Sequence, residues 1–140
     1  MSLSVHAIDE AVHAPPGLEK PTTLVVRNLS PYCRQSHVFQ ELWVINLQQH
    51  ADFVHVPIDY DSKYCTGICF VNFSDPAHAA SARALWHGAT HFGGYRCHSP
   101  GLNVCFAKDQ GFDKCVSHHY KRTKYFRDSK LKFWVRPDKD

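Results

Sequence analysis

The chain has 140 residues, of which 44% are hydrophobic, so it is long and apolar enough for one folded domain. No stretch approaches 18 apolar residues, and no basic start leads into an apolar run, so we expect neither a membrane span nor a secretory signal. Residues 1–113 carry seven Lys and Arg against ten Asp and Glu, whereas residues 114–140 carry nine against three. The basic segment favours a polyanionic partner, although a solvated tail without a binding role has the same composition.

The first half of the chain predicts a strand, a helix and a second strand. Residues 1–20 show no periodicity and run into the Pro- and Gly-rich APPGLEKP, which is typical of a flexible linker. TTLVVRNL, residues 22–29, is rich in β-branched side chains and predicts a strand. Residues 34–48 predict a helix because their apolar side chains recur at helical spacing. DFVHVPID, residues 52–59, alternates and predicts the second strand.

The second half predicts another strand–helix–strand unit. GICFVNF, residues 67–73, is the third strand and follows a polar loop. Asp75 and Pro76 predict a helix start, because Asp caps free N–H groups and the fixed φ of Pro suits the first turn. Gly88 predicts its end, and an irregular run then leads to LNVCFAK, residues 102–108, as the fourth strand.

The chain continues well beyond the fourth strand. One helical stripe carries Phe112, Cys115, Val116, His119, Thr123 and Phe126, and it predicts a third helix. SKLKFWVRP, residues 129–137, alternates and predicts an extended segment that packs on the body. We therefore expect a linker over residues 1–20, a folded domain over residues 21–110, and a basic extension over residues 111–140 packed on that domain.

The order of the elements predicts a ferredoxin-like α+β sandwich, in which one antiparallel sheet carries two helices on one face. The opposite face is then either a binding surface or is covered by something else. Strand alternation decides which side chains point to that face. The predicted set is Val25, Arg27, Phe53, His55, Ile68, Phe70, Asn72, Asn103 and Cys105.

Two strands resemble the signature motifs of the RNA-recognition motif (RRM). TGICFVNF, residues 66–73, has the Gly and aromatic spacing of the RRM octamer, and LVVRNL, residues 24–29, is similar to the hexamer. The resemblance implies a βαββαβ fold that stacks RNA bases on aromatic rings of the sheet. Of the three usual rings only Phe70 is present, because Val25 and Ile68 occupy the other positions. Without compensation the loss costs on the order of 30-fold to 10⁴-fold in affinity, at about 1–3 kcal/mol per base.

A narrower resemblance covers residues 22–137. TTLVVRNLSPYC, ADFVHVPIDYDSKYCTGICFVNFSDPAHA and FAKDQG are similar to the C-terminal RRM of the Mei-two-like RNA-binding proteins. DFVHVPIDY is the most specific part, since ordinary RRMs rarely have Pro–Ile–Asp at this place. The family implies single-stranded RNA binding in which a basic C-terminal extension takes part. Ile68 stands here in place of the family's octamer Tyr, and His55 holds the second-strand ring position.

The extension can compensate for the missing stacking rings of the sheet, because it interleaves cations with aromatic rings. The cations neutralise phosphate and the rings stack bases. The competing interpretation is that the rings only pack the extension onto the domain. The residues predicted to contact RNA are Arg27, His55, Ile68, Phe70, Asn103, Lys108, Tyr120, Lys121, Arg122, Lys124 and Arg127. We expect a non-enzymatic protein of RNA processing or regulation, with protein partners in a ribonucleoprotein assembly. The alternative is a protein-binding RRM, which the missing rings favour.

Neither metal nor catalytic chemistry is indicated. Cys115 and His118 form a lone C-x₂-H pair without a second zinc knuckle, and the chain lacks a Gly-rich phosphate loop and a G-x-S-x-G element. No cofactor and no metal are therefore expected. The six Cys are expected as small buried side chains of an intracellular protein rather than as disulfides, with a nuclear location favoured over a cytoplasmic one.

Overall fold

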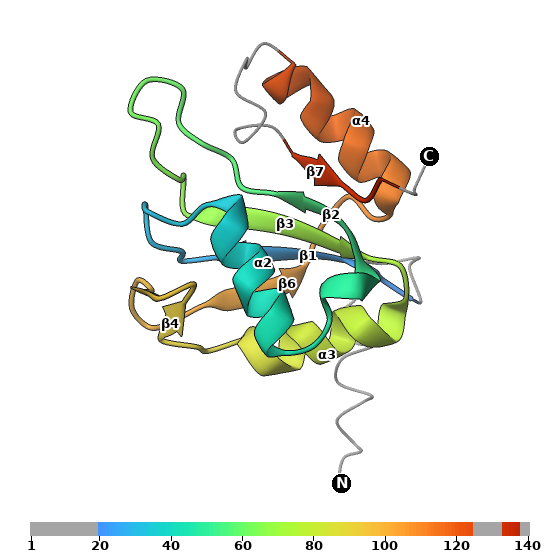
Figure 1. The fold of residues 1–140 in the computed structure, drawn as a ribbon, viewed down its shortest axis with the longest axis horizontal. Helices are drawn as coiled ribbons and strands as arrows, with labels where there is room; N and C mark the ends of the chain where they lie inside the picture. Colours follow the sequence, from blue (N-terminus) through green and yellow to red (C-terminus); the bar gives the residue numbers. More distant parts are fainter. Residues whose placement is uncertain (1–19, 125–132, 138–140) are drawn as a thin grey trace, which may run out of the picture.

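An antiparallel sheet with two helices on one face forms the centre of the molecule (Figure 1). The computed structural model describes residues 20–124 and 133–137 of the chain. The elements of this unit are β1 (Thr23–Arg27), α2 (Gln35–Val44), β2 (Ala51–His55), β3 (Ile68–Phe73), α3 (Pro76–Trp86) and β6 (Asn103–Phe106). The predicted ferredoxin-like α+β sandwich is confirmed, with each strand shorter than its sequence pattern suggested.

The sheet has five strands in the order β6-β1-β3-β2-β7, and every neighbouring pair is antiparallel. The fifth strand, β7 (Trp134–Val135), belongs to the predicted extended segment and extends the sheet beside β2. Arg136 fixes it there, because its guanidinium donates to the carbonyl oxygens of Ala51 and Gln48. Trp134 meets Phe39 of α2 edge to face at 4.8 Å between ring centroids, so β7 is packed as well as paired.

The two helices begin and end for identifiable reasons. Asp75 caps α3, since its Oδ1 accepts a hydrogen bond from the Ala77 N–H at 2.7 Å and Pro76 opens the first turn. Helix α2 is shorter than predicted, because Asn46 adopts φ +61° and turns the chain out of the helix. A separate 3-10 turn, η1 (Gln48–His50), follows it and leads into β2.

The run between α3 and β6 was expected to be irregular, but it contains a small hairpin. Its strands are β4 (His91–Phe92) and β5 (Tyr95–Arg96), joined by Gly93 and Gly94 with φ of +64° and +88°. Two-residue strands are too short to show alternation, whereas the Gly–Gly pair is a turn signal. The hairpin rests on α2, because the Gly93 N–H donates to Glu41 Oε2 at 2.7 Å and a Cβ there would lie 2.5 Å from His37 Cβ.

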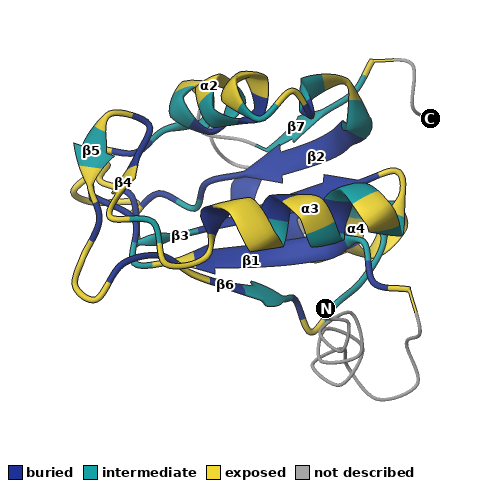
Figure 2. Ribbon diagram, turned by 90° about the horizontal axis from the view of Figure 1, so that it is seen from below, coloured by how far each residue is buried: buried dark blue, intermediate teal, exposed yellow. Residues whose placement is uncertain are grey.

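Buried side chains lie on both faces of the sheet, and β2 is buried along its whole length (Figure 2). The face toward α2 and α3 carries the main core, whose sheet residues include Leu24, Val26, Val54, Cys69, Val71, Phe73 and Val104. The predicted orientation of these strands is therefore confirmed. The other face is partly covered by α4 (Phe112–Thr123), which crosses β2 and β3 (Figure 1). Its predicted stripe points to the sheet, with Cys115, His119 and Thr123 buried.

Candidate nucleic-acid interface

Helix α4 docks on the β2–β3 half of the sheet through aromatic contacts around His119. The His119 ring lies 4.5 Å from Phe70, 4.7 Å from His55 and 5.7 Å from Phe53 between centroids. Phe133 closes the group at 5.2 Å from Phe53. His55 is consequently 2% exposed. The expectation of an accessible His55 on an open face is corrected: its register is as predicted, but the extension buries it.

A hydrogen-bond network fixes the start of α4 against the sheet. Gln110 Oε1 accepts from the N–H groups of Thr22 and Thr23, both at 2.8 Å, and its Nε2 donates to the Thr23 carbonyl at 2.9 Å. The Gly111 N–H donates to Thr23 Oγ1 at 2.9 Å, and that hydroxyl donates to Asn72 Oδ1 at 2.6 Å. Such a satisfied, partly buried network specifies one position for the helix. Sequence reasoning missed Gln110, because no local pattern marks a side chain that binds 87 residues away.

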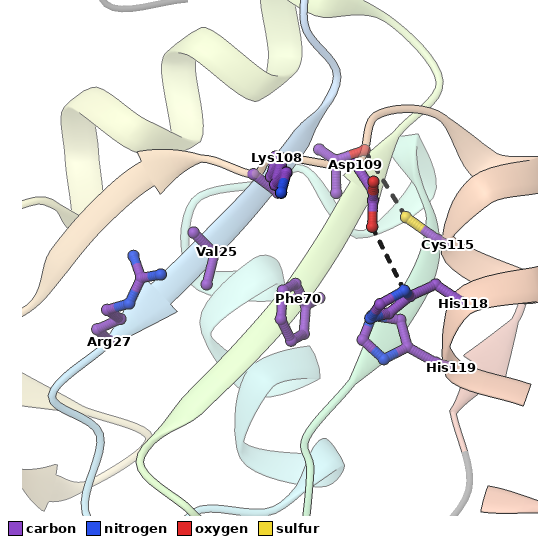
Figure 3. A pocket seen from close by; sticks show the side chains of 10 residues that line it. Val25, Arg27, Phe70, Lys108, Asp109, Cys115, His118 and His119 are labelled. Atoms are coloured by element: carbon purple, nitrogen blue, oxygen red, sulfur yellow. Dashed lines mark hydrogen bonds and ion pairs between the residues drawn. The ribbon is translucent and has the colours of Figure 1, made fainter. Parts of the chain in front are cut away.

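The sheet remains open beside α4, where a cleft of about 250 Å³ lies over β1 and β3. It is lined by Thr23, Val25, Arg27, Phe70, Ala107, Lys108, Asp109, Cys115, His118 and His119. Figure 3 shows the Phe70 ring between Arg27 and Lys108 on the strand side and the two histidines of α4. The cleft therefore combines one half-buried ring with two exposed cations.

The wall of the cleft on the α4 side is polar. Asp109 Oδ2 lies 3.4 Å from His118 Nδ1, so a carboxylate and an imidazole are held together at the rim (Figure 3). Cys115, deeper in the cleft, bonds weakly with Thr23 Oγ1 at 3.7 Å. Burial raises the pKa of the Cys115 thiol to about 11. The thiol is therefore neutral at physiological pH and is not an activated nucleophile.

The predicted RNA-contacting residues of the domain separate into three places. Arg27, Phe70 and Lys108 meet in the first cleft. Ile68 lies in a second cleft, of about 270 Å³, which shares only Arg27 with the first. Asn103 is exposed on β6 directly across from Arg27 in the strand pairing.

The predicted residues of the extension are described in part. Tyr120 is 55% exposed and Lys124 is exposed at the end of α4, so both are accessible to a ligand. The side chains of Lys121 and Arg122, and all of Arg127, lie outside the described residues. Their predicted contacts with RNA therefore stay predictions.

The cysteines form no metal site in the described part of the chain. No group of three or more His, Cys, Asp or Glu among residues 20–124 and 133–137 could hold a metal ion. All six Cys are free thiols. Burial, together with the neighbouring Cys65 and Cys97 thiols, raises the pKa of Cys33 to about 12. Within the same residues, no helix combines the length and apolar character needed to cross a bilayer.

Two curated proteins illustrate what the chain is similar to, and no protein-family model matches it. "Multiple RNA-binding domain-containing protein 1" of Mycosarcoma maydis is 36% identical over 64 residues, which are 46% of this chain and 8% of that protein. "Serine/arginine-rich SC35-like splicing factor SCL33" of Arabidopsis thaliana is 34% identical over 91 residues, covering 64% of this chain and 28% of that protein. The chain thus spans only a small part of each relative.

Solved structures share the fold. The N-terminal RNA-binding domain of a hypothetical protein aligns with a TM-score of 0.53 at 26% identity, over 71% of this chain and 94% of that one. A "Sxl-lethal protein/RNA complex" aligns with a TM-score of 0.52 at 21% identity, over 65% and 49%. The Rna15 RRM with bound RNA aligns with a TM-score of 0.50 at 15% identity, over 71% and 96%. The chain therefore has the α+β fold of the RRM.

Proposed function

We propose that this RRM-fold domain binds single-stranded RNA in the cleft between α4 and the β1–β6 side of the sheet. The observation that carries the proposal is the Phe70 ring in a cleft with the exposed side chains of Arg27 and Lys108. A ring offers a stacking surface to any base, and the cations neutralise the flanking phosphates. The names of both curated relatives, which describe RNA-binding and splicing proteins, support a binding module rather than an enzyme.

The cleft favours modest base selectivity. Among the rings of β1, β2 and β3, Phe70 is the accessible one, because α4 covers His55. Val25, which takes the place of a usual stacking ring, is aliphatic and 4% exposed. Stacking on one ring does not distinguish bases, since every base has a π-face. The Asp109–His118 pair, which can bond base edges, lies on the α4 side of the cleft. Most of the affinity is then electrostatic and falls with added salt.

We further propose that the basic extension takes part in binding through Tyr120, Lys121, Arg122, Lys124 and Arg127. Their support is compositional: the segment carries most of the chain's excess positive charge beside aromatic residues. The resemblance of DFVHVPIDY to the C-terminal RRM of Mei-two-like proteins supports the same role. On this basis we propose a nuclear protein of RNA processing or regulation that works with protein partners in a ribonucleoprotein assembly. The splicing-factor relative supports that setting.

Fluorescence anisotropy with a random single-stranded RNA pool at two salt concentrations tests the function. We expect micromolar or tighter binding at low salt that weakens as salt is added. Arg27→Gln and Lys108→Gln should each lower the slope of log affinity against log salt by about 0.7, the value for one phosphate contact on a single strand. Gln40→Glu, which changes the net charge equally on exposed α2, is the matched control and should leave the slope unchanged. An unchanged slope in both cleft variants would contradict the cleft.

A second candidate function is protein binding, which a different surface favours. Trp43 and Val44 at the end of α2 are 66% and 73% exposed, and large exposed apolar side chains are enriched at protein interfaces. The same anisotropy experiment separates the two candidates. If the folded protein binds no RNA from the pool at low salt, the RNA proposal fails and the protein-binding function stands.

A further inference from the structure

Three tyrosines from separate loops meet at one end of the sheet. Tyr32 follows β1, Tyr64 lies between β2 and β3, and Tyr95 belongs to the β4–β5 hairpin; in Figure 1 these segments share the left end of the sheet. The Tyr32 ring lies 5.7 Å from Tyr64, edge to face, and 5.8 Å from Tyr95. Tyr32 and Tyr64 are 56% and 49% exposed. We call these three residues the tyrosine platform.

The platform is held in place by its supporting loops. The Cys65 N–H donates to the Pro31 carbonyl at 2.8 Å, which ties the Tyr64 loop to the Tyr32 loop. Arg34 Nη2 donates to the Lys63 carbonyl at 2.6 Å and adds a second tie between them. His37 of α2 supports Tyr95 edge to face at 5.0 Å. Rings that are fixed before a ligand arrives lose less conformational entropy on binding.

A second cleft lies between the first cleft and the loops that carry Tyr32 and Tyr64. It has a volume of about 270 Å³ and is lined by Arg27, Asn28, Leu29, Pro31, Cys65, Thr66, Gly67, Ile68 and His98. Arg27 also lines the first cleft, so the two clefts meet at one exposed cation. At the far side, Pro31 and Cys65 are the chain neighbours of Tyr32 and Tyr64. The second cleft therefore has Arg27 on one side and the loops that carry Tyr32 and Tyr64 on the other.

We propose that the tyrosine platform stacks further bases of the same RNA strand that the first cleft binds. The proposal rests on the proposed function and extends its site. Single-stranded RNA is the occupant the surface favours, because Arg27 joins the two clefts and a phosphate backbone is the ligand that needs a cation between successive base sites. The tyrosines of the platform would supply stacking rings in place of those that are missing at Val25 and Ile68.

The test compares four proteins in anisotropy with a labelled single-stranded RNA pool. Tyr32→Ser/Tyr64→Ser should weaken binding at least about fivefold, the effect of losing one stacked base. Tyr32→Phe/Tyr64→Phe keeps both rings and should bind as the wild type does. Leu85→Ser removes an exposed apolar side chain from α3 and is the matched control without effect. The salt slope should be the same in all four, because none of the changes removes a cation.

The outcomes distinguish the inference from the function beneath it. If the wild type binds RNA and the double Ser variant binds equally well, the platform is overturned while the first cleft stands. If the wild type binds no RNA, both fail. Thermal unfolding of each variant excludes a folding defect. Tyr32→Phe/Tyr64→Phe changes the same two positions but keeps both rings, so weakened binding by this variant would show that the rings alone are not the cause. Ultraviolet cross-linking should place RNA on peptides with Tyr32 or Tyr64. If the platform instead binds a proline-rich peptide and RNA does not compete with that peptide, the RNA assignment is overturned.

Discussion

At the scale of single residues, the same strand position can be buried or available depending on what lies above it. Phe70 and His55 are direct partners across β3 and β2, so their side chains share a face. Phe70 stays half-buried at the edge of α4, whereas His55 lies wholly beneath it. The proposed affinity for RNA then depends on few side chains, each of which matters more than in a sheet with three accessible rings.

Burial also determines how the thiols respond to pH. The Cys33 pKa is about 12, against an ordinary value of 9.0. A raised pKa means that the folded protein keeps a proton that the unfolded chain loses above pH 9.0. The stability from this group is therefore complete below pH 9.0 and is lost as the pH rises toward 12.

Urea unfolding should accordingly show a lower free energy of unfolding at about pH 10.5 than at about pH 8. Cys33→Ala should show a smaller fall over the same interval, because it lacks one of the shifted thiols. The difference between the two proteins isolates Cys33 from Lys and Tyr titration. An equally steep fall in Cys33→Ala would contradict the burial argument.

At the scale of elements, α4 and β7 convert a four-stranded sheet with an open face into a five-stranded sheet that is half covered. β7 pairs with β2, and α4 lies across β2 and β3 (Figure 1). The segment between them is outside the described residues, but both flanks are anchored at β2, with α4 across it and β7 beside it. The extension thereby leaves β1 and β6 as the accessible side.

Gln110 is the residue whose loss should loosen this arrangement. Gln110→Ala removes the acceptor for the N–H groups of Thr22 and Thr23 and the donor to the Thr23 carbonyl. Unpaired, partly buried backbone groups cost about 1–3 kcal/mol, so the free energy of unfolding should fall by about that amount. Urea denaturation measures it, with Gln49→Ala at an exposed position as the control. A fall no larger than in the control would show that the network does not stabilise the fold.

At the scale of the whole molecule, the charge is divided between a neutral domain, which carries six Lys and Arg against six Asp and Glu over residues 21–110, and a strongly basic extension. The domain places Arg27 and Lys108 in one cleft. We propose that the cations of the extension bind the same polyanion. A polyanion bound along the sheet would then be neutralised by both parts, which makes the salt dependence a property of the full chain.

Replacing Lys121, Arg122, Lys124 and Arg127 together with Gln should weaken RNA binding and flatten its salt dependence. Each cation that contacts phosphate contributes about 0.7 to the slope of log affinity against log salt. Anisotropy titrations at several salt concentrations give the slope directly. A folded variant with an unchanged slope would remove the extension from the binding site and leave the cleft as the whole of it.

Local sequence patterns determined most of the elements of this protein. Alternation identified the four strands and the side each residue faces, and Asp75–Pro76 marked the start of α3. The stripe of α4 was also readable, since its buried members recur at helical spacing. These features depend on residues close in the chain, whose geometry is set by backbone periodicity.

Only the tertiary structure decided which surfaces remain accessible. A stripe predicts that α4 is buried against something, but not that it lies over β2 and β3 and covers His55. The tyrosine platform likewise depends on loops that are distant in the chain, and no period in the sequence relates Tyr32, Tyr64 and Tyr95. The physical reason is that contacts between distant segments depend on how whole elements dock, which short-range periodicity does not record.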